Sequence, residues 1–342
     1  MLPNVTIIIL NWNGWKDTIR CLESLLKINY TNYNFIIVDN GSTDDSIKKI
    51  KDYCKGEIPI TSKFLDYNSF NKPIEIIECD KNKIETGKNF KNLKFHKNLL
   101  IIENRNNHGF AGGNNIAIKY LIKNVPDLDY ILLLNNDTIV EKNFLYELIK
   151  TSENDKNVGI VGPKIYTFDK NEIIKDKVGF TGSNIHFYLG GFPKGLRNLE
   201  KPIKVDMVSG ACILIKKELI KKIGMLDPIY FFGIEDADYC ITAAKKGYKV
   251  LGVPKAEIWH EIGGSHQITS NNYSFILSEG IKNHLIFMSR HASITQKILS
   301  MVFLLLYYIF LIFKSENLKE MKIKAIAIKK GINNFFVYKN NH

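Results

Sequence analysis

The sequence has few cysteines, and they do not occur in close pairs. Cys21, Cys54, Cys79, Cys212 and Cys240 are odd in number and spread widely over 342 residues. A disulfide framework uses an even set of cysteines, and a structural zinc site uses closely spaced ones. We therefore exclude both and expect reduced thiols in a cytosolic setting.

Arginine is also scarce, although the chain is basic. Lys and Arg number 47 against 35 Asp and Glu, which gives a net charge of +12, but most of the basic residues are scattered lysines. Nucleic-acid-binding surfaces cluster their basic residues, so we expect no nucleic-acid partner. An anionic membrane or a phosphorylated ligand suits this charge better.

The N-terminus lacks the basic region of a signal peptide. Its apolar run is only Val5–Leu10, which we interpret as a first strand. Hydrophobic residues make up 45% of the chain, which excludes global disorder.

The most informative stretch is Tyr130–Thr138, with the sequence YILLLNNDT. Its aliphatic residues, Ile131–Leu134, predict a buried strand that ends abruptly in polar residues. Ligands of open α/β sheets bind at the carboxyl ends of the strands, and an acid there can hold a divalent cation. Asp137 is therefore either a metal ligand or the N-cap of a helix predicted over Ile139–Lys150.

Two earlier predicted strands also end in polar residues. Val5–Leu10 leads into Asn11, and Phe35–Val38 leads into Asp39. An acid after a second parallel strand often contacts a nucleoside. By local logic alone, Asp39 could equally stabilise its own turn.

A glycine-rich turn, HGFAGGNN, covers residues 108–115 between a predicted strand, Leu99–Glu103, and a helix through Ile116–Ile122. Glycines in such a turn let the backbone approach a phosphate or sugar at the positive end of a helix. The spacing is neither GxGxxG nor that of a P-loop, so the motif is weak evidence by itself.

The segment of about residues 55–97 is rich in Lys, Asn and Asp and has few periodic apolar positions. We expect a surface insertion outside the sheet, with one candidate strand at Ile74–Glu78.

Three acids follow an aromatic cluster in residues 230–240, which read YFFGIEDADYC. We expect a helix that starts at the acids and continues to Lys246. Acids in a first helical turn complement the helix dipole, and a carboxylate near an apolar wall can be tuned to accept a proton from a hydroxyl. Further on, His260 follows a predicted strand, Ala256–Trp259, where it could serve a structural role or reach a metal.

The C-terminal region contains sixteen uncharged residues, Ile298–Phe313, followed by seven Lys against two Glu from Lys314 to the end. The run is just shorter than a usual membrane span, and its basic flank suits an anionic cytoplasmic leaflet. We favour membrane attachment, as a short span or an interfacial helix, over burial at a subunit contact.

Taken in order, these stretches resemble the inverting glycosyltransferases of family 2, and most closely the rhamnosyltransferase-type enzymes of cell-surface polysaccharide assembly. The resemblance rests on IIILNWNG, IIVDNGSTDDS, NNHGFAGGNN, LLLNNDT, FFGIEDADYC and WHEIGGS. It implies an α/β protein of the GT-A fold, with a Rossmann-like nucleotide-binding sheet flanked by helices over residues 1–270. Residues 271–342 would form a helical, membrane-associating region.

The resemblance also implies a role for each candidate residue. Asp236 is the expected catalytic base, with Glu235 beside it, and Asp137 and His260 are the expected ligands of a Mn²⁺ or Mg²⁺ ion. Asp137 is the single carboxylate of a DxD-type motif that here reads NND. The expected donor-binding residues are Asn11, Asp39, Gly109, Gly112, Asn114, Asn136 and Asp137, and the expected acceptor-side residues are Asp238 and Phe232.

The implied reaction moves a sugar, with rhamnose as the first candidate, from a nucleotide-sugar donor to a glycan or lipid-linked glycan at the cytoplasmic face of the cell membrane. A UDP-linked hexose or N-acetylhexosamine is the alternative donor. A non-catalytic, membrane-bound module that binds glycan or nucleotide sugar is the alternative class. A nucleotidyltransferase is disfavoured because NWNGWKD offers no basic pyrophosphate-binding loop near the N-terminus.

Overall fold

The computed structural model describes residues 1–60, 65–80, 99–169, 172–173, 181–185, 199–261 and 272–341. The strands in these ranges are β1 (Val5–Asn11), β2 (Tyr33–Asn40), β3 (Ile76–Asp80), β4 (Leu99–Asn104), β5 (Tyr130–Asn135), β6 (Thr138–Val140), β7 (Val158–Asp169), β8 (Glu172–Ile173), β9 (Ile203–Lys204), β10 (Cys212–Lys216) and β11 (Lys249–Glu261). The helices are α1 (Trp15–Leu25), α2 (Ser46–Lys55), α4 (Gly109–Asn124), α5 (Phe144–Glu153), α6 (Lys217–Ile223), α7 (Glu235–Lys245), α8 (Tyr273–His291), α9 (Ile294–Phe313) and α10 (Leu318–Asn341), with a 3₁₀ turn, η1, at Ser69–Asn71.

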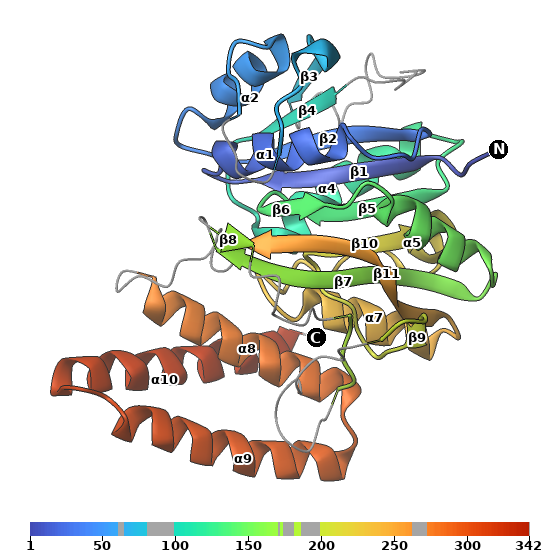
Figure 1. Cartoon of the computed structure of the whole chain (residues 1–342). Coiled ribbons are helices and arrows are strands. Elements are labelled where there is room, and N and C mark those ends of the chain that lie inside the picture. Colours follow the sequence, from blue (N-terminus) through green and yellow to red (C-terminus); the bar gives the residue numbers. More distant parts are fainter. Residues whose placement is uncertain are drawn as a thin grey trace.

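A single mixed sheet forms the centre of the molecule (Figure 1), with the strand order β3-β4-β2-β1-β5-β10-β7-β11-β6. Strands β3, β4, β2, β1 and β5 run parallel, as expected for a nucleotide-binding sheet. Strand β10 is antiparallel to both of its neighbours, β5 and β7. The parallel half therefore carries the polar strand ends, and the mixed half continues the sheet beside them.

Helices cover both faces of the sheet, because its strands are apolar on both sides. In β1, Ile8 belongs to the core that packs against α4, α6 and α7, whereas Ile7 and Ile9 belong to the core beneath α1, α2 and α5. Alternate side chains of a strand point to opposite faces, so a run without polar residues requires two covering layers.

Register brings the predicted polar strand ends together at one edge. Asn11 pairs with Asp39 across β1 and β2, and Leu10 pairs with Asn135 across β1 and β5. The polar residues that follow these strands therefore lie at one edge of the sheet.

The structure corrects the prediction for the residues after Asp137. The predicted helix over Ile139–Lys150 begins only at Phe144, because Thr138–Val140 form β6, which pairs antiparallel with β11. Asn143, and not Asp137, is the N-cap residue of α5. Asp137 is therefore not a helix cap.

The segment of residues 55–97 also differs in part from its prediction. Residues Ile76–Asp80 form β3, which pairs parallel with β4 at the edge of the sheet, so this part of the segment does not lie outside the sheet. Residues 61–64 and 81–98 lie outside the described residues. The predicted strand Ala256–Trp259 is the end of one long strand, β11, whose register with β7 shifts between Val253 and Glu257.

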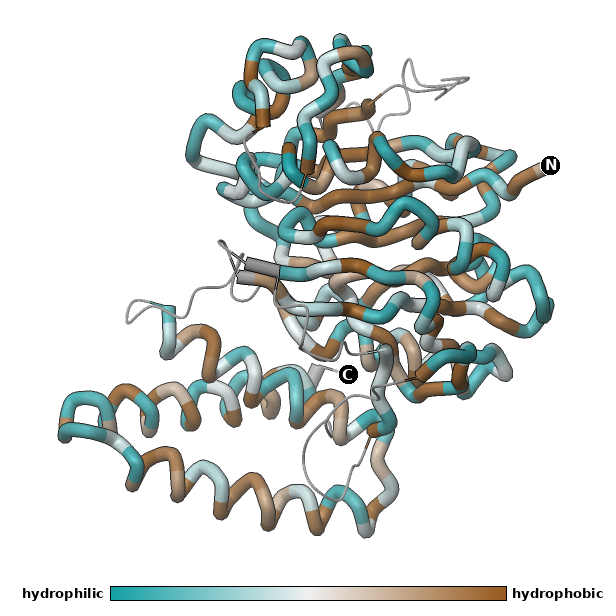
Figure 2. Tube along the Cα trace, viewed as in Figure 1, coloured by the Kyte–Doolittle hydropathy of each residue, from teal (hydrophilic) through white to brown (hydrophobic). Residues whose placement is uncertain are grey.

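The three C-terminal helices form a separate layer beneath the sheet in the view of Figure 1. Helix α10 lies along α8 so closely that a Cβ on Gly331 would be 2.7 Å from the Ser278 carbonyl oxygen. Helix α9 has a mean hydropathy of 2.0 over 20 residues and is the one helix in the described ranges that is long and apolar enough to cross a membrane. Figure 2 shows apolar residues along its length, and most of them are exposed.

Candidate active site

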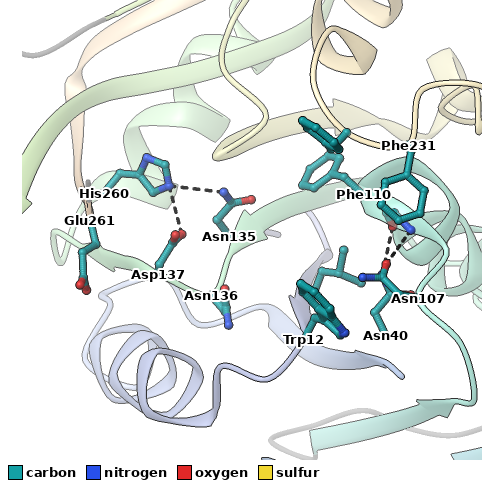
Figure 3. Close-up of a pocket in the computed structure, with 13 residues that line it drawn as sticks. Trp12, Asn40, Asn107, Phe110, Asn135, Asn136, Asp137, Phe231, His260 and Glu261 are labelled. Carbon is teal, nitrogen blue, oxygen red and sulfur yellow. Dashed lines mark hydrogen bonds and ion pairs between the residues drawn. The ribbon is translucent and has the colours of Figure 1, made fainter. Parts of the chain in front are cut away.

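A cavity of about 270 Å³ lies at the carboxyl ends of the parallel strands (Figure 3). It is lined by Leu10, Trp12, Asn40, Asn107, Gly109, Phe110, Asn135, Asn136, Asp137, Phe231, Phe232, His260 and Glu261. The cavity therefore brings together five of the predicted site residues: Gly109, Asn136, Asp137, Phe232 and His260.

Asp137 and His260 lie against each other at one end of the cavity (Figure 3). Asp137 Oδ1 is 3.0 Å from His260 Nε2, because the antiparallel pairing of β6 with β11 places His260 opposite Thr138, the residue next to Asp137. Burial alone would lower the pKa of His260, but the hydrogen bond and the negative charge of Asp137 outweigh burial and raise it. The pair is thus held together electrostatically at the floor of the cavity.

The same pair has the chemistry and spacing of two metal ligands. Neighbouring ligands of an octahedral cation with bonds of about 2.1 Å are about 3.0 Å apart, which is the separation of these two atoms. Within the described ranges, no group of three or more His, Cys, Asp or Glu residues is placed to hold a metal ion. Among the described residues, Asp137 and His260 are therefore the pair that would be available to such a cation.

Glu261 lines the cavity next to His260, and sequence analysis missed it. Its Oε2 forms an ion pair with Arg20 Nη2, which also lies 2.8 Å from Asp17 Oδ1. Simple strand alternation would place Glu261 on the face opposite His260, so the pattern gave no reason to choose it. The one feature of the sequence that could have indicated Glu261 is its position directly after His260, a candidate site residue.

Trp12 is a second lining residue that sequence analysis did not select, and its side chain is 42% exposed at the cavity. Aromatic side chains that are left exposed in a cavity provide flat apolar surfaces on which a sugar or base can pack.

A chain of buried hydrogen bonds connects the cavity to two more predicted residues. Asn136 Nδ2 donates to Thr18 Oγ1 (3.1 Å), Thr18 Oγ1 donates to Asn11 Oδ1 (2.8 Å), and Asn11 Nδ2 donates to Asp39 Oδ1 (2.8 Å). Asp39 Oδ2 also accepts the Ser42 N–H at 3.0 Å, so Asp39 does stabilise its turn. Asn11 and Asp39 lie beneath the cavity and do not line it, and contact between Asp39 and a nucleoside stays a prediction.

The glycines of the HGFAGGNN turn are in close contact with other parts of the protein. Gly109 has φ +71°, and a Cβ there would lie 2.1 Å from the Phe231 carbonyl oxygen. On Gly113, a Cβ would lie 2.6 Å from Leu10 Cδ1, and on Gly112 it would lie 2.9 Å from His108 Cβ. Contact of Gly109 and Gly112 with a donor stays a prediction, and Gly109 itself lines the cavity.

Asn114 likewise does not line the cavity. Its side chain is 1% exposed, and Nδ2 donates to the Phe110 carbonyl oxygen within α4 at 2.9 Å.

We expect Gly109→Ala to destabilise the fold by more than about 2 kcal/mol, since it combines a left-handed backbone with a backbone clash. Gly247→Ala is the matched control. Gly247 has φ +86° but has no atom within 4 Å of an added Cβ, so only the backbone cost of about 1 kcal/mol applies. Thermal or urea denaturation of the two variants measures the difference. Equal losses would show that the Phe231 carbonyl can move aside freely.

Asp236 lies beside the cavity, in the first turn of α7. Its Oδ2 accepts the Gly210 N–H and its Oδ1 accepts the Ala237 N–H, both at 2.8 Å. A Cβ on Gly210 would be 3.4 Å from Asp236 Oδ2 and 3.5 Å from Cζ of Phe110, so Asp236 and this lining residue both approach Gly210. Asp236 is adjacent to the cavity without lining it.

Burial shifts the pKa values of two neighbouring acids, Glu235 and Asp236. Burial raises the pKa of Asp236, and burial together with the charge of Asp236 raises the pKa of Glu235 to about 8. Asp236 accepts two backbone N–H bonds, whereas Glu235 Oε2 has no hydrogen-bond partner among the described residues. The two backbone N–H bonds favour the charged form of Asp236, whereas the neutral form of Glu235 is favoured by burial and by the charge of Asp236.

Asp238 is not among the residues that line the cavity, and its expected role on the acceptor side stays a prediction. Its Oδ1 accepts the Tyr230 hydroxyl at 2.9 Å and lies 2.8 Å from His291 Nε2. These contacts hold the pKa of Asp238 below its ordinary value despite burial. The carboxylate connects α7 to α8.

Solved structures with the same arrangement of strands and helices are glycosyltransferases. The crystal structure of GalNAc-T7 with UDP, GalNAc and Mn²⁺ matches with a TM-score of 0.61 and 14% identity, covering 100% of this chain and 58% of that one. The mannosyltransferase PcManGT of Pyrobaculum calidifontis, in complex with GDP-Man and Mn²⁺, matches with a TM-score of 0.51 and 13% identity, covering 98% and 87%. The fold is the GT-A fold.

Sequence comparison identifies the family. Residues 6–83 match the family model Glycosyl transferase family 2, and residues 76–276 match Glycosyltransferase like family 2. The chain belongs to glycosyltransferase family 2.

Similar proteins include hexosyl- and rhamnosyltransferases. The low-salt glycan biosynthesis hexosyltransferase Agl10 of Haloferax volcanii is 28% identical to this chain. The matched region covers 45% of this chain and 49% of Agl10, so the chain spans about half the length of that relative. The dTDP-rhamnosyl transferase RfbF of Shigella flexneri is 22% identical over 66% of this chain and 76% of its own. The rhamnosyltransferase WbbL of Escherichia coli is 26% identical over 52% and 67%. The predicted likeness to rhamnosyltransferases is confirmed.

Proposed function

We propose that this protein is a metal-dependent, inverting glycosyltransferase that moves a sugar from a nucleotide-sugar donor to a hydroxyl of a glycan or lipid-linked glycan. The observation that carries the proposal is the placement of two different kinds of group around one cavity. Asp137 and His260 lie at one end, and Asp236 contacts Gly210, which the lining residue Phe110 also approaches. Asp137 and His260 are suitable ligands for a diphosphate-bound cation, and Asp236 is suitable as a general base.

Each residue has a defined part in the proposed displacement. Asp236 takes the proton of the acceptor hydroxyl as that oxygen forms a bond to C1 of the donor sugar. The bond from C1 to the phosphate oxygen breaks, the nucleoside diphosphate leaves with the electron pair, and the configuration at C1 inverts. Asp137 and His260 would hold the divalent cation, which when bound supplies positive charge to the departing diphosphate.

Rhamnose carried by a deoxythymidine diphosphate is the first candidate donor, since two of the relatives described above are named for rhamnosyl transfer. UDP-linked hexose or N-acetylhexosamine is the alternative, and Agl10 is named a hexosyltransferase. A non-catalytic binding module is less consistent with a chain that keeps Asp137, Asp236 and His260 together.

The test is slow donor hydrolysis by the full-length protein across a panel of nucleotide sugars, with Mn²⁺, Mg²⁺ or EDTA. Metal-dependent release of nucleotide from one donor supports the proposed class and identifies the sugar. If no donor is hydrolysed, calorimetry with the same panel is the second step. Absence of both hydrolysis and binding would refute the proposal.

We also propose that α9 attaches the enzyme to the cytoplasmic face of the membrane. The helix has 20 residues, about 30 Å at 1.5 Å per residue, and most of its apolar side chains are exposed, apart from a stripe that includes Leu304 and Tyr308. Seven lysines follow from Lys314 onward, as suits an anionic surface.

Leu305→Asp should abolish flotation with vesicles that contain anionic phospholipid, because an acid at the centre of a membrane-embedded helix costs about 3 kcal/mol. Tyr146→Asp is the control. Tyr146 is 46% exposed, compared with 60% for Leu305, but it lies on α5. Flotation of Leu305→Asp at the wild-type level would exclude α9 as the anchor.

A further inference from the structure

The segment before α7 ends in an unusual backbone conformation. We call residues Asp227–Ile234 the pre-α7 loop. Gly233 and Ile234 both have left-handed backbones, with φ of +76° and +77°. This conformation is rare for a β-branched residue, so surrounding contacts must hold Ile234 in place. Because Ile234 is the N-cap residue of α7, its backbone sets the direction in which Glu235 and Asp236 leave the loop.

Helix α8 supplies contacts that hold this loop. Asn283, which is fully buried, donates through Nδ2 to the Phe232 carbonyl oxygen at 2.9 Å and to that of Gly233 at 3.4 Å. Its neighbour Lys282 donates to the Ile229 carbonyl oxygen at 3.0 Å. These bonds satisfy loop carbonyls that precede the left-handed turn.

The aromatic part of the loop also rests on α8. The Phe275 ring lies 5.6 Å from that of Phe231 and 6.1 Å from that of Phe232, and both loop residues line the cavity. Helix α8 is thus directly behind one wall of the active site.

The C-terminal end of α8 contacts both the start of the loop and the first turn of α7. Arg290 Nη2 lies 2.8 Å from Asp227 Oδ2, and His291 Nε2 lies 2.8 Å from Asp238 Oδ1. Arg290 Nε in turn donates to the Tyr338 hydroxyl of α10 at 3.0 Å. Both ends of the pre-α7 loop are therefore fixed to α8.

One helix face makes several of these contacts. Phe275, Lys282 and Arg290 follow one another at intervals of seven and eight residues, which places them on one side of a helix, with Asn283 next to Lys282. This arrangement explains why α8 buries an asparagine and directs charged groups toward the catalytic domain.

We infer that Asn283 is a positioning residue for the proposed glycosyl transfer: by fixing the left-handed end of the pre-α7 loop, it orients Asp236 toward the cavity. The inference rests on the proposed function. Under this inference, α8 has two roles: it positions the proposed catalytic base, and it connects the sheet to α9, the proposed membrane-attachment helix.

The experiment compares Asn283→Asp with Phe287→Leu in the full-length protein. The first change keeps the shape of the side chain but replaces both N–H donors with an oxygen that faces two carbonyl oxygens. The second removes buried packing from the same helix, where Phe287 is 1% exposed, but keeps both donors to the loop carbonyls, Lys282 and Asn283. It controls for loss of stability alone.

We expect kcat of Asn283→Asp to fall by about tenfold to a hundredfold, the size expected for a misplaced catalytic group. Its donor Kd should stay within about twofold of wild type, since Asp137 and His260 lie on other elements. Phe287→Leu should lower the Tm while retaining kcat. Wild-type kcat in Asn283→Asp, or equal losses in both variants, would overturn the inference.

A second measurement does not depend on turnover. The Asp238 N–H donates to the Ile234 carbonyl oxygen, and the Phe110 N–H donates to that of Phe231, both at 2.8 Å. Hydrogen exchange at these two amides should accelerate in Asn283→Asp and stay near wild type in Phe287→Leu. Unchanged exchange refutes the positioning role even if no donor is ever turned over, so this result is distinguishable from failure of the proposed function.

Lys282→Met is the alternative variant if Asn283→Asp does not fold. It removes the bond to the Ile229 carbonyl from a side chain that is not fully buried. We expect a severalfold fall in kcat and faster exchange at the same two amides, and no change in either would contradict the inference.

Discussion

Asp236→Asn is expected to lower the turnover of sugar transfer by about 10²–10⁴-fold, the contribution of a general base. The amide cannot accept the proton of the acceptor hydroxyl, but it retains the shape of the carboxylate. Donor affinity should stay nearly intact, because Asp137 and His260 are at the other end of the cavity. Single-turnover rates with the identified donor, together with calorimetric donor binding, measure the two effects separately.

Glu235→Gln is the matched control for this substitution. Since the pKa of Glu235 is raised to about 8, this residue is protonated at neutral pH, and glutamine mimics that neutral form. We expect Glu235→Gln to retain most of the turnover. A large loss in Glu235→Gln with turnover preserved in Asp236→Asn would make Glu235 the base.

The pH dependence of the wild type should agree with this assignment. Asp236 can accept a proton only when it is ionised, so the rate should fall as pH drops through its pKa. Burial raises that pKa above the ordinary value of 3.8, and the acidic limb should therefore lie at higher pH than for an exposed aspartate. A rate that is flat down to the ordinary range of aspartate would contradict the assignment.

Asp137→Ala should remove the metal dependence of donor binding and weaken binding in Mn²⁺ by at least about tenfold to a hundredfold, the loss typical even of residues that only support metal ligands. Calorimetric titration of a nucleoside diphosphate in Mn²⁺ and in EDTA measures this effect. Asp137→Asn, which preserves the size of the side chain, separates the loss of charge from a change in packing.

Glu257→Gln is the carboxylate control for the metal experiment. Glu257 lies on β11 with His260, but its Oε1 accepts the Tyr166 hydroxyl at 3.0 Å, and it does not line the cavity. It should bind the nucleoside diphosphate as the wild type does. If Asp137→Ala retains the metal dependence of the wild type, Asp137 is not a metal ligand.

The sequence was sufficient to predict the residues at the ends of buried parallel strands. Apolar runs such as Ile131–Leu134 identify these strands, and chain direction alone then brings Asn11, Asp39 and Asp137 to one edge. The fold class followed from the same pattern and from the family resemblance.

Local patterns failed where a tertiary contact decides the outcome. Thr138–Val140 form a strand because β11 pairs with them. The sequence around Asp137 gives no indication of this pairing, because β11 is distant in the chain. The spacing of the acids in α7 likewise could not separate Asp236, beside the cavity, from Asp238, which binds Tyr230 and His291. Gly109 was recognised as special, but its neighbour is the Phe231 carbonyl, which is distant in the sequence.

The pairing of β6 with β11 also determines when the proposed metal site can exist. Asp137 is made early in synthesis, but its partner His260 is at the end of β11, and the two meet only when this long-range ladder closes. Contacts between residues far apart in the chain form slowly, because loop-closure entropy opposes them. A nascent or truncated chain that ends before β11 therefore carries the polar ends of the parallel strands without the aspartate–histidine pair. The proposed metal site would therefore be completed only after most of the sheet has been synthesised.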